Sequence, residues 1–199
     1  MSAGYDDIAW DEIYAAGEHR DNWDRAEPAP ELVELVEARG WPHGARAIDL
    51  GCGTGSDARY LADNGFAVTG VDISEVAIRE AVERTPTNVD ITWLTADACR
   101  LPLEDASQDL VADGACLHHF TREQWDDYAR EVARILVPRG VLFVRGVSVK
   151  HRATNVLRRE WIEQVFDSGD FRVESMRDFT LIGAGDREAP GLRAVILRT

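Results

Sequence analysis

The sequence has few cysteines and few basic residues, and both shortages argue against particular classes of protein. Its 199 residues include three cysteines, Cys52, Cys99 and Cys116, which are scattered and form no C-x-x-C pair. We therefore expect neither a disulfide framework nor a metal site. Lysine and arginine total 22 against 36 aspartates and glutamates, a formal net charge of -14. This imbalance argues against nucleic acid or an anionic membrane as a partner, although solubility alone would also explain it.

Long hydrophobic runs are missing as well. No apolar stretch approaches the roughly 20 residues that a membrane-spanning helix needs. The N-terminal residues MSAGYDDIAWDEIY are acidic and lack the basic and apolar regions of a secretory signal. An apolar fraction of 45% with six tryptophans nevertheless suffices for a packed core. We expect one cytoplasmic domain over residues 1–199, acting as a monomer or homodimer.

Short apolar runs alternate with amphipathic helical patterns along the chain. This alternation predicts an α/β fold, a doubly wound, mostly parallel sheet of seven strands with helices on both faces and an antiparallel last strand. The expected strands are residues 46–50, 66–72, 89–97, 109–115, 141–146, 171–179 and 193–199. The expected helices are residues 31–40, 56–65, 75–85, 121–136 and 153–168. Ser74 is placed to cap the third of these helices, and Thr121 with Gln124 has capping-box spacing before the fourth.

The stretch AIDLGCGTGS, residues 47–56, joins the first strand to a glycine-rich loop at the edge where such sheets bind ligands. A phosphate-binding loop would need a lysine after the glycines, and none follows. A dinucleotide fingerprint is weakened but remains open, because Ser56 stands where its third glycine would be. A plain tight turn is the alternative without a ligand.

The loop and the segments after it resemble class I S-adenosylmethionine-dependent methyltransferases, over roughly residues 45–146. Asp49 followed by G-x-G-x-G resembles their first motif, Asp72 ends VTGVDIS, Asp97 and Ala98 lie in LTADACRLPL, and DLVADGACLHHF resembles the fourth-strand motif. The resemblance implies a Rossmann-like fold with S-adenosyl-L-methionine as cofactor. The cofactor-binding residues that it implies are Asp49, Gly51, Cys52, Gly53, Asp72, Ile73, Asp97, Ala98 and Asp113. The positive sulfonium suits a loop with Asp49, where a lysine would repel it.

Candidate catalytic residues follow the fourth strand. Methyl transfer needs a general base only where the nucleophile carries a proton of high pKa. His118 and His119 are the predicted catalytic residues, since either imidazole can accept a proton from a hydroxyl, amine or thiol. A histidine that packs at a strand–helix junction, with its nitrogens bonded to the backbone, is the alternative interpretation.

The N-terminal residues 1–27 are expected to form a lid that shapes the acceptor site over a core of residues 28–199. The predicted acceptor-contacting residues are Tyr5, Trp10, Tyr14 and Trp23, together with Arg145 after the fifth strand. The helical spacing of Trp10 and Tyr14 is equally typical of simple docking on the core. Arg145, Lys150, His151 and Arg152 either attract an anionic acceptor or belong to a solvated loop. Residues 180–192 are expected to form a movable loop beside the site.

The expected function is methyl transfer to oxygen, nitrogen or sulfur of a small-molecule metabolite. NWDRAEPAPEL resembles a W-D-x-G-x-P-x-P segment of the thiopurine, thiol and halide methyltransferases, with Asn22 and Ala26 as departures. The chain as a whole resembles small-molecule methyltransferases of the thiopurine, thiol or tellurite type. This makes a thiol or thiopurine S-methyltransferase one alternative. A non-catalytic cofactor-binding subunit and a nucleotide-dependent oxidoreductase are the others.

Overall fold

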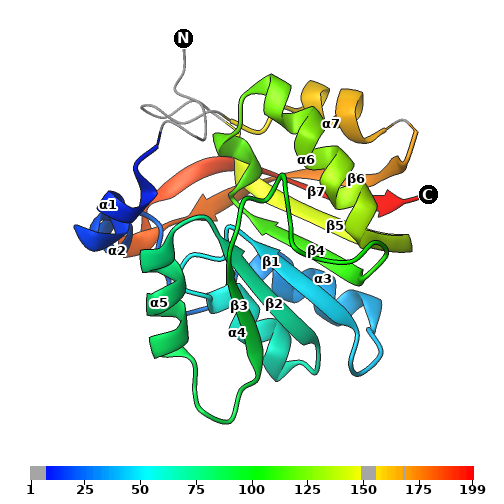
Figure 1. Cartoon of the computed structure of the whole chain (residues 1–199). Coiled ribbons are helices and arrows are strands. Elements are labelled where there is room, and N and C mark those ends of the chain that lie inside the picture. Colours follow the sequence, from blue (N-terminus) through cyan, green and yellow to red (C-terminus); the bar gives the residue numbers. More distant parts are fainter. Residues whose placement is uncertain (1–7, 149–155, 168) are drawn as a thin grey trace.

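Seven strands form one sheet in the order β3-β2-β1-β4-β5-β7-β6 (Figure 1). The computed structural model describes residues 8–148, 156–167 and 169–199. The strands are β1 Arg46–Leu50, β2 Ala67–Asp72, β3 Ile91–Thr95, β4 Gln108–Gly114, β5 Leu136–Val147, β6 Phe171–Ile182 and β7 Glu188–Arg198. The first five strands pair in parallel, and β7 pairs antiparallel with both β5 and β6. The predicted mostly parallel sheet with an antiparallel last strand is confirmed.

Helices cover both faces of the sheet because successive side chains of a strand point to opposite sides. They are α1 Trp10–Ala15, α2 Glu18–Asn22, α3 Pro30–Arg39, α4 Ser56–Asp63, α5 Glu75–Arg84, α6 Arg122–Ile135 and α7 Arg159–Phe166, with short 3-10 turns η2 Leu117–His119 and η3 Ala184–Asp186. Ile48 of β1 packs in the core cluster that contains residues of α6 and α7. Its neighbour Ala47 packs in the cluster that contains residues of α3 and α4. The two clusters make a doubly wound, three-layered core.

The predicted helix starts are confirmed by the caps. The Ser74 hydroxyl accepts a hydrogen bond from the Ala77 amide at 3.1 Å, which begins α5. Thr121 and Gln124 form the reciprocal capping box that begins α6. Local side-chain chemistry therefore fixes both helix starts beside the ligand-bearing edge of the sheet.

Two expectations near the C-terminus were wrong. Residues 180–182 pair with residues 188–190, so β6 and β7 are longer than predicted. The movable loop expected over residues 180–192 is therefore reduced to residues 183–187, which include η3. The last helix begins at Arg159 rather than near residue 153, although residues 149–155 are outside the described ranges.

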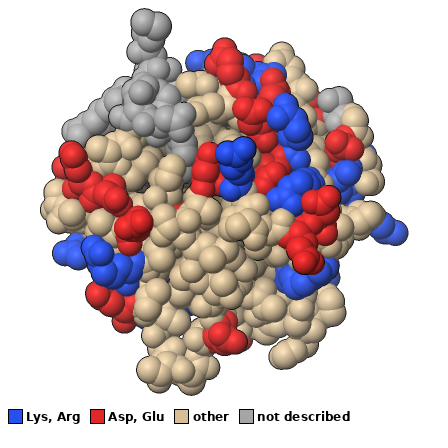
Figure 2. Space-filling model, in the orientation of Figure 1, with Lys and Arg blue, Asp and Glu red and all other residues tan. Residues whose placement is uncertain are grey.

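The face shown in Figure 2 carries charges of both signs side by side. On α6 the pairs Arg122–Asp126 and Arg130–Asp127 lie 3.0 and 2.8 Å apart. The described part of this face therefore has no continuous basic area that would attract a phosphate backbone. Each helix within the described ranges is too short or too polar to span a bilayer.

Candidate active site

The glycine loop, residues 51–55, leaves β1 and enters α4 with a backbone that only glycine adopts easily. Gly51, Gly53 and Gly55 have φ values of 65°, 54° and 83°. A Cβ on Gly51 would lie 2.7 Å from Cβ of Cys116, and one on Gly53 would lie 2.9 Å from the Tyr14 hydroxyl. Much of the space beside these glycines is thus filled by the protein's own side chains, which the sequence reasoning did not foresee.

Asp72 ends β2 directly beside this loop. The Gly53 amide donates to one carboxylate oxygen at 2.9 Å, and the Ser74 amide donates to the other at 2.9 Å. Burial raises the pKa of Asp72, while these backbone hydrogen bonds work to lower it. A carboxylate has about four acceptor positions, so these backbone bonds leave room for a further donor. Asp72 therefore both fixes the loop and can accept from a ligand hydroxyl.

Asp49 is fully buried in β1 under the loop. One of its oxygens, Oδ2, has no hydrogen-bond partner. Burial, followed by the negative charges of Asp57 and Asp113, raises its pKa well above the usual value. A buried carboxylate oxygen without a partner is costly. An ammonium group of a ligand would supply the missing donor, so this site fits the amino-acid end of S-adenosylmethionine.

Asp97 and Ala98 follow β3, the neighbour of β2. Asp97 is exposed and accepts a hydrogen bond from the Cys99 amide at 2.8 Å, whereas Ala98 is buried. Asp49, Asp72 and Asp97 thus belong to the ends of three adjacent strands, β1, β2 and β3. An extended ligand bound across this edge would meet three carboxylates in turn.

Cys52 and Ile73 also lie at this edge, where the Cys52 thiol donates a weak hydrogen bond to the Gly53 carbonyl at 3.8 Å. The Cys52 amide donates to the Val71 carbonyl at 3.0 Å, which ties the loop to β2. Its thiol is buried, and burial raises the thiol pKa well above the usual value. Ile73 is partly buried against the core. Both residues are placed to give apolar contacts.

Asp113, at the end of β4, turns inward. Its oxygens accept hydrogen bonds from the Cys116 amide at 2.8 Å, the Leu117 amide at 3.0 Å and the Tyr128 hydroxyl at 2.9 Å. Burial raises the pKa of Asp113 to about 6, although these hydrogen bonds act to lower it. The side chain is fully buried. A direct contact with a cofactor, as predicted from the sequence, would require this turn to open, so the geometry favours a structural role.

His118 and His119 form η2 immediately after this turn. His118 is buried against Gly146 of β5, and its Nδ1 has no hydrogen-bond partner. Burial, with the nearby His119 and Arg145, lowers the pKa of His118 well below the usual value. Burial also lowers the pKa of His119 to about 4. Both imidazoles are therefore neutral near pH 7, and His119 is a weak base suited to an acidic proton.

The N-terminal aromatic residues gather at this end of the sheet. The ring of Trp10 meets His119 edge-on, with centroids 4.8 Å apart, and lies 6.2 Å from Trp23. Trp23 is 43% exposed. Tyr14 is buried, and its hydroxyl lies over Gly53. The structure thus brings Trp10 to a candidate catalytic residue and Tyr14 to the glycine loop, while Tyr5 lies outside the described residues.

Arg145 projects from β5 into the same region. Its Nη2 lies 3.9 Å from Oδ2 of Asp57, and its Nε is buried without a hydrogen-bond partner. The positive charge of Arg145 acts to lower the pKa of Asp49. The rest of the predicted basic cluster, Lys150, His151 and Arg152, lies outside the described residues. Within the described ranges no group of three or more acidic, histidine or cysteine residues could hold a metal ion.

Sequence reasoning missed several polar contacts between the N-terminal segment and this site. Asp11 of α1 accepts from the Ser74 hydroxyl at 2.6 Å, and this bond lowers its pKa. Asp24 accepts from the hydroxyl of Thr54, inside the glycine loop, at 2.6 Å. Only the resemblance of the Trp23-Asp24 pair to a family segment marked Asp24 in advance.

Comparison with known proteins places this site in a family. A family model described as a methyltransferase domain matches residues 47–140. The 27-O-demethylrifamycin SV methyltransferase of Amycolatopsis mediterranei is 34% identical over 157 residues, 71% of this chain and 56% of the relative. The 2-methyl-6-phytyl-1,4-hydroquinone methyltransferase of Synechocystis is 36% identical over 104 residues, 52% of this chain and 32% of the relative. The chain thus spans less than two thirds of either relative.

Two further similarities concern the family and the fold, respectively. An uncharacterized methyltransferase of Schizosaccharomyces pombe is 30% identical over 107 residues, which are 53% of this chain and 74% of the relative. A solved structure described as "Conversion of a Disulfide Bond into a Thioacetal Group during Echinomycin Biosynthesis" shares the fold, with a TM-score of 0.83 and 23% identity over 95% of this chain and 90% of that one. The finer resemblance to thiopurine-, thiol- or tellurite-type enzymes is not confirmed and stays a prediction. The chain belongs to the class I S-adenosylmethionine-dependent methyltransferases.

Proposed function

We propose that this protein transfers the methyl group of S-adenosylmethionine to oxygen, nitrogen or sulfur of a small molecule. The observation that carries the proposal is the row of Asp49, Asp72 and Asp97 at three adjacent strand ends beside the glycine loop. The cofactor supplies a methyl group on a sulfonium, a good leaving group, so the protein's main task is to align the acceptor.

Each carboxylate suits one part of the cofactor. The partnerless oxygen of Asp49 would accept from the methionyl ammonium. Asp72, held by two backbone amides, would accept from the ribose hydroxyls. Asp97, exposed at the end of β3, would accept from the adenine amino group. Gly51, Gly53, Cys52, Ile73 and Ala98 would line the same edge.

The acceptor would lie near His119 and Trp10, whose rings are in contact. A neutral His119 with a pKa of about 4 is a weak base, so a phenolic hydroxyl or a thiol suits it better than a less acidic aliphatic hydroxyl. The ring of Trp10, which meets His119 edge-on, would present an apolar surface to a flat acceptor. Two relatives bear names that contain a hydroquinone and a rifamycin, which fits a small organic molecule as the acceptor.

A thiol acceptor is the second candidate, supported by the Trp23-Asp24 pair followed by Pro28 and Pro30. The remaining alternative is a non-catalytic subunit that only binds the cofactor. Turnover of any acceptor by the isolated chain would exclude it.

Calorimetry tests the central proposal. S-adenosylhomocysteine should bind the purified protein, and a reduced nicotinamide dinucleotide should not. Asp72→Asn should weaken binding of S-adenosylhomocysteine by roughly ten- to a hundred-fold, because a hydrogen bond to a charged group contributes about 1.5–3 kcal/mol. Asp109→Asn is the control, since Asp109 accepts from the Arg46 amide at 2.8 Å at the opposite edge of the sheet. Absence of S-adenosylhomocysteine binding by the wild type would refute the proposal.

A screen of phenols, thiols, amines and carboxylates, with release of S-adenosylhomocysteine as the readout, would then identify the acceptor class. His119→Gln should lower turnover of the best acceptor while leaving the affinity for S-adenosylhomocysteine unchanged. Equal turnover by this variant would exclude His119 as the base.

A further inference from the structure

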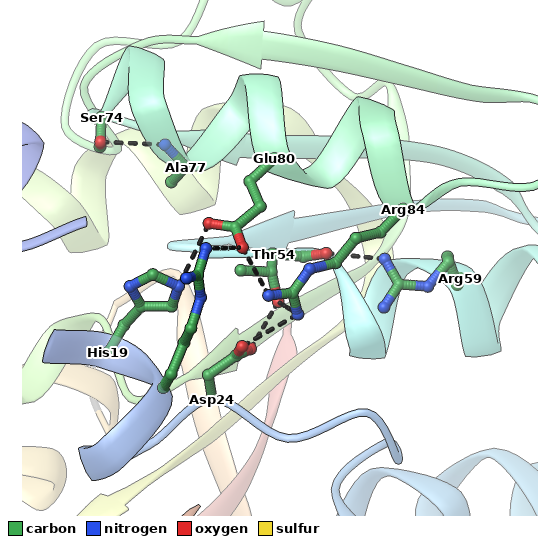
Figure 3. A network of polar contacts seen from close by, with 9 residues as sticks. His19, Asp24, Thr54, Arg59, Ser74, Ala77, Glu80 and Arg84 are labelled. Carbon is green, nitrogen blue, oxygen red and sulfur yellow. Dashed lines mark hydrogen bonds and ion pairs between the residues drawn. The ribbon is translucent and has the colours of Figure 1, made fainter. Parts of the chain in front are cut away.

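Thr54 anchors the glycine loop through its side chain. It stands between Gly53 and Gly55, and it is 4% exposed. Its hydroxyl donates to Oδ1 of Asp24 at 2.6 Å and accepts from Nη1 of Arg84 at 3.0 Å. Figure 3 shows Asp24 and Arg84 reaching Thr54 from two directions, one from the N-terminal segment and one from the end of α5. The loop is therefore held by groups far from it in sequence.

These two partners also hold each other. Nη1 of Arg84 lies 2.9 Å from Oδ2 of Asp24, and its Nη2 lies 2.6 Å from Oε1 of Glu80. Glu80 also pairs with Arg20 at 3.0 Å, and His19 lies 3.1 Å from its other oxygen (Figure 3). Burial acts to raise the pKa of Glu80, but the bonds from Arg20 and Arg84 outweigh it and lower the pKa. The side chain of Asp24 is 12% exposed, so this network is better shielded than an isolated surface pair.

A second contact reaches the neighbouring loop residue. The ring of Trp23 meets the ring of Tyr14 edge-on, with centroids 6.2 Å apart, and the Tyr14 hydroxyl lies over Gly53. The consecutive residues Trp23 and Asp24 therefore act on the consecutive residues Gly53 and Thr54, the first through Tyr14 and the second directly. The Trp23-Asp24 pair therefore contacts the glycine loop, through Tyr14 at Gly53 and directly at Thr54.

A loop with three left-handed glycines loses much conformational freedom when it binds a ligand. Contacts that hold such a loop in one conformation before binding lower that loss and tighten binding. We infer that Trp23 and Asp24, together with Arg84, clamp the glycine loop and are positioning residues for the methyl donor, rather than recognition residues for the acceptor. This inference rests on the proposed function and names the residues through which the N-terminal segment acts on that site.

The test compares Asp24→Ala with Asp109→Ala. Both aspartates pair with an arginine, but Asp109 holds Arg46 at the opposite edge of the sheet. Asp24→Ala should weaken S-adenosylhomocysteine binding by roughly ten-fold, as expected for loss of one shielded, charge-assisted hydrogen bond. Asp109→Ala should leave binding unchanged. Thermal unfolding of both variants separates loss of affinity from loss of fold.

A double-mutant cycle then assigns the effect to the loop. In a Thr54→Val background, Asp24→Ala should change the affinity far less than in the wild type, since the contact is already absent. If Asp24→Ala does not fold, Thr54→Val alone should show the weakened binding. Once an acceptor has been identified, Asp24→Ala should raise the KM for S-adenosylmethionine and leave the KM for the acceptor unchanged.

Wild-type affinity in Asp24→Ala, or a rise confined to the acceptor KM, would overturn the inference. Both outcomes require that the wild type binds S-adenosylhomocysteine, so they differ from a failure of the proposed function, in which the wild type does not bind at all.

Discussion

Replacing Gly51 by alanine should damage both the stability of the fold and the cofactor site. Gly51 has a φ of 65°, and a Cβ there would lie 2.7 Å from Cβ of Cys116. Gly40 is a matched control because its φ is 61° and a Cβ there would meet nothing within 4 Å. Both substitutions impose the same backbone strain, and only Gly51→Ala adds a collision with a buried neighbour.

The magnitude follows from these two contributions. A left-handed alanine costs about 1–2 kcal/mol, and overpacking of a buried contact costs about 1–3 kcal/mol more. For a chain of this size each kcal/mol lowers the Tm by about 2–4 °C. We therefore expect Gly40→Ala to lower the Tm by about 4 °C and Gly51→Ala to lower it by about 10 °C.

The assay is thermal unfolding with and without saturating S-adenosylhomocysteine. The ligand should raise the Tm of the wild type and of Gly40→Ala by the same amount, and that of Gly51→Ala by less. Cys116→Gly introduced into Gly51→Ala removes the colliding Cβ and should restore part of the lost stability. Equal effects of Gly51→Ala and Gly40→Ala on Tm and ligand shift would refute the reasoning from close packing.

Two further predictions concern buried titratable groups. Burial holds the pKa of His119 at about 4, below the 6.5 of an unperturbed histidine. The folded state therefore binds fewer protons between these values, and lowering the pH from about 7.5 to about 5 should destabilise the wild type more than His119→Gln, by about 2 kcal/mol in urea unfolding. A parallel pH dependence of the two proteins would contradict this. Tyr128→Phe removes a hydrogen bond that lowers the pKa of Asp113, so NMR titration should find that pKa above about 6. An unchanged Asp113 pKa would show that the bond contributes nothing.

Elements that depend on nearby residues could be predicted from the sequence. The apolar run of residues 46–50 predicted β1, and the hydroxyl of Ser74 predicted the start of α5, because strand alternation and helix capping involve groups a few residues apart. The glycine spacing and the acids at the ends of three strands also led to a prediction of the cofactor site, and that site stays a prediction. Parallel strands in this order bring their carboxyl ends to one edge.

Long-range packing decided the rest. Asp113 looked like a ligand contact in its motif, but the structure turns it toward the Tyr128 hydroxyl, a partner 15 residues along the chain. Asp24 looked like part of an acceptor segment, but it meets Thr54, 30 residues away. The side chains that make glycine necessary at positions 51 and 53 come from Cys116 and Tyr14.

The sequence by itself determined the order of strands and helices, because this order follows from local periodicity and capping. The resemblance of its motifs to known methyltransferases determined the family. Only the tertiary structure decided which polar groups near the carboxyl ends of the strands have hydrogen-bond partners within the protein and which, like Oδ2 of Asp49, have none. The physical reason is that burial and hydrogen-bond partnership depend on what the fold brings against a side chain, and those neighbours come from distant parts of the chain.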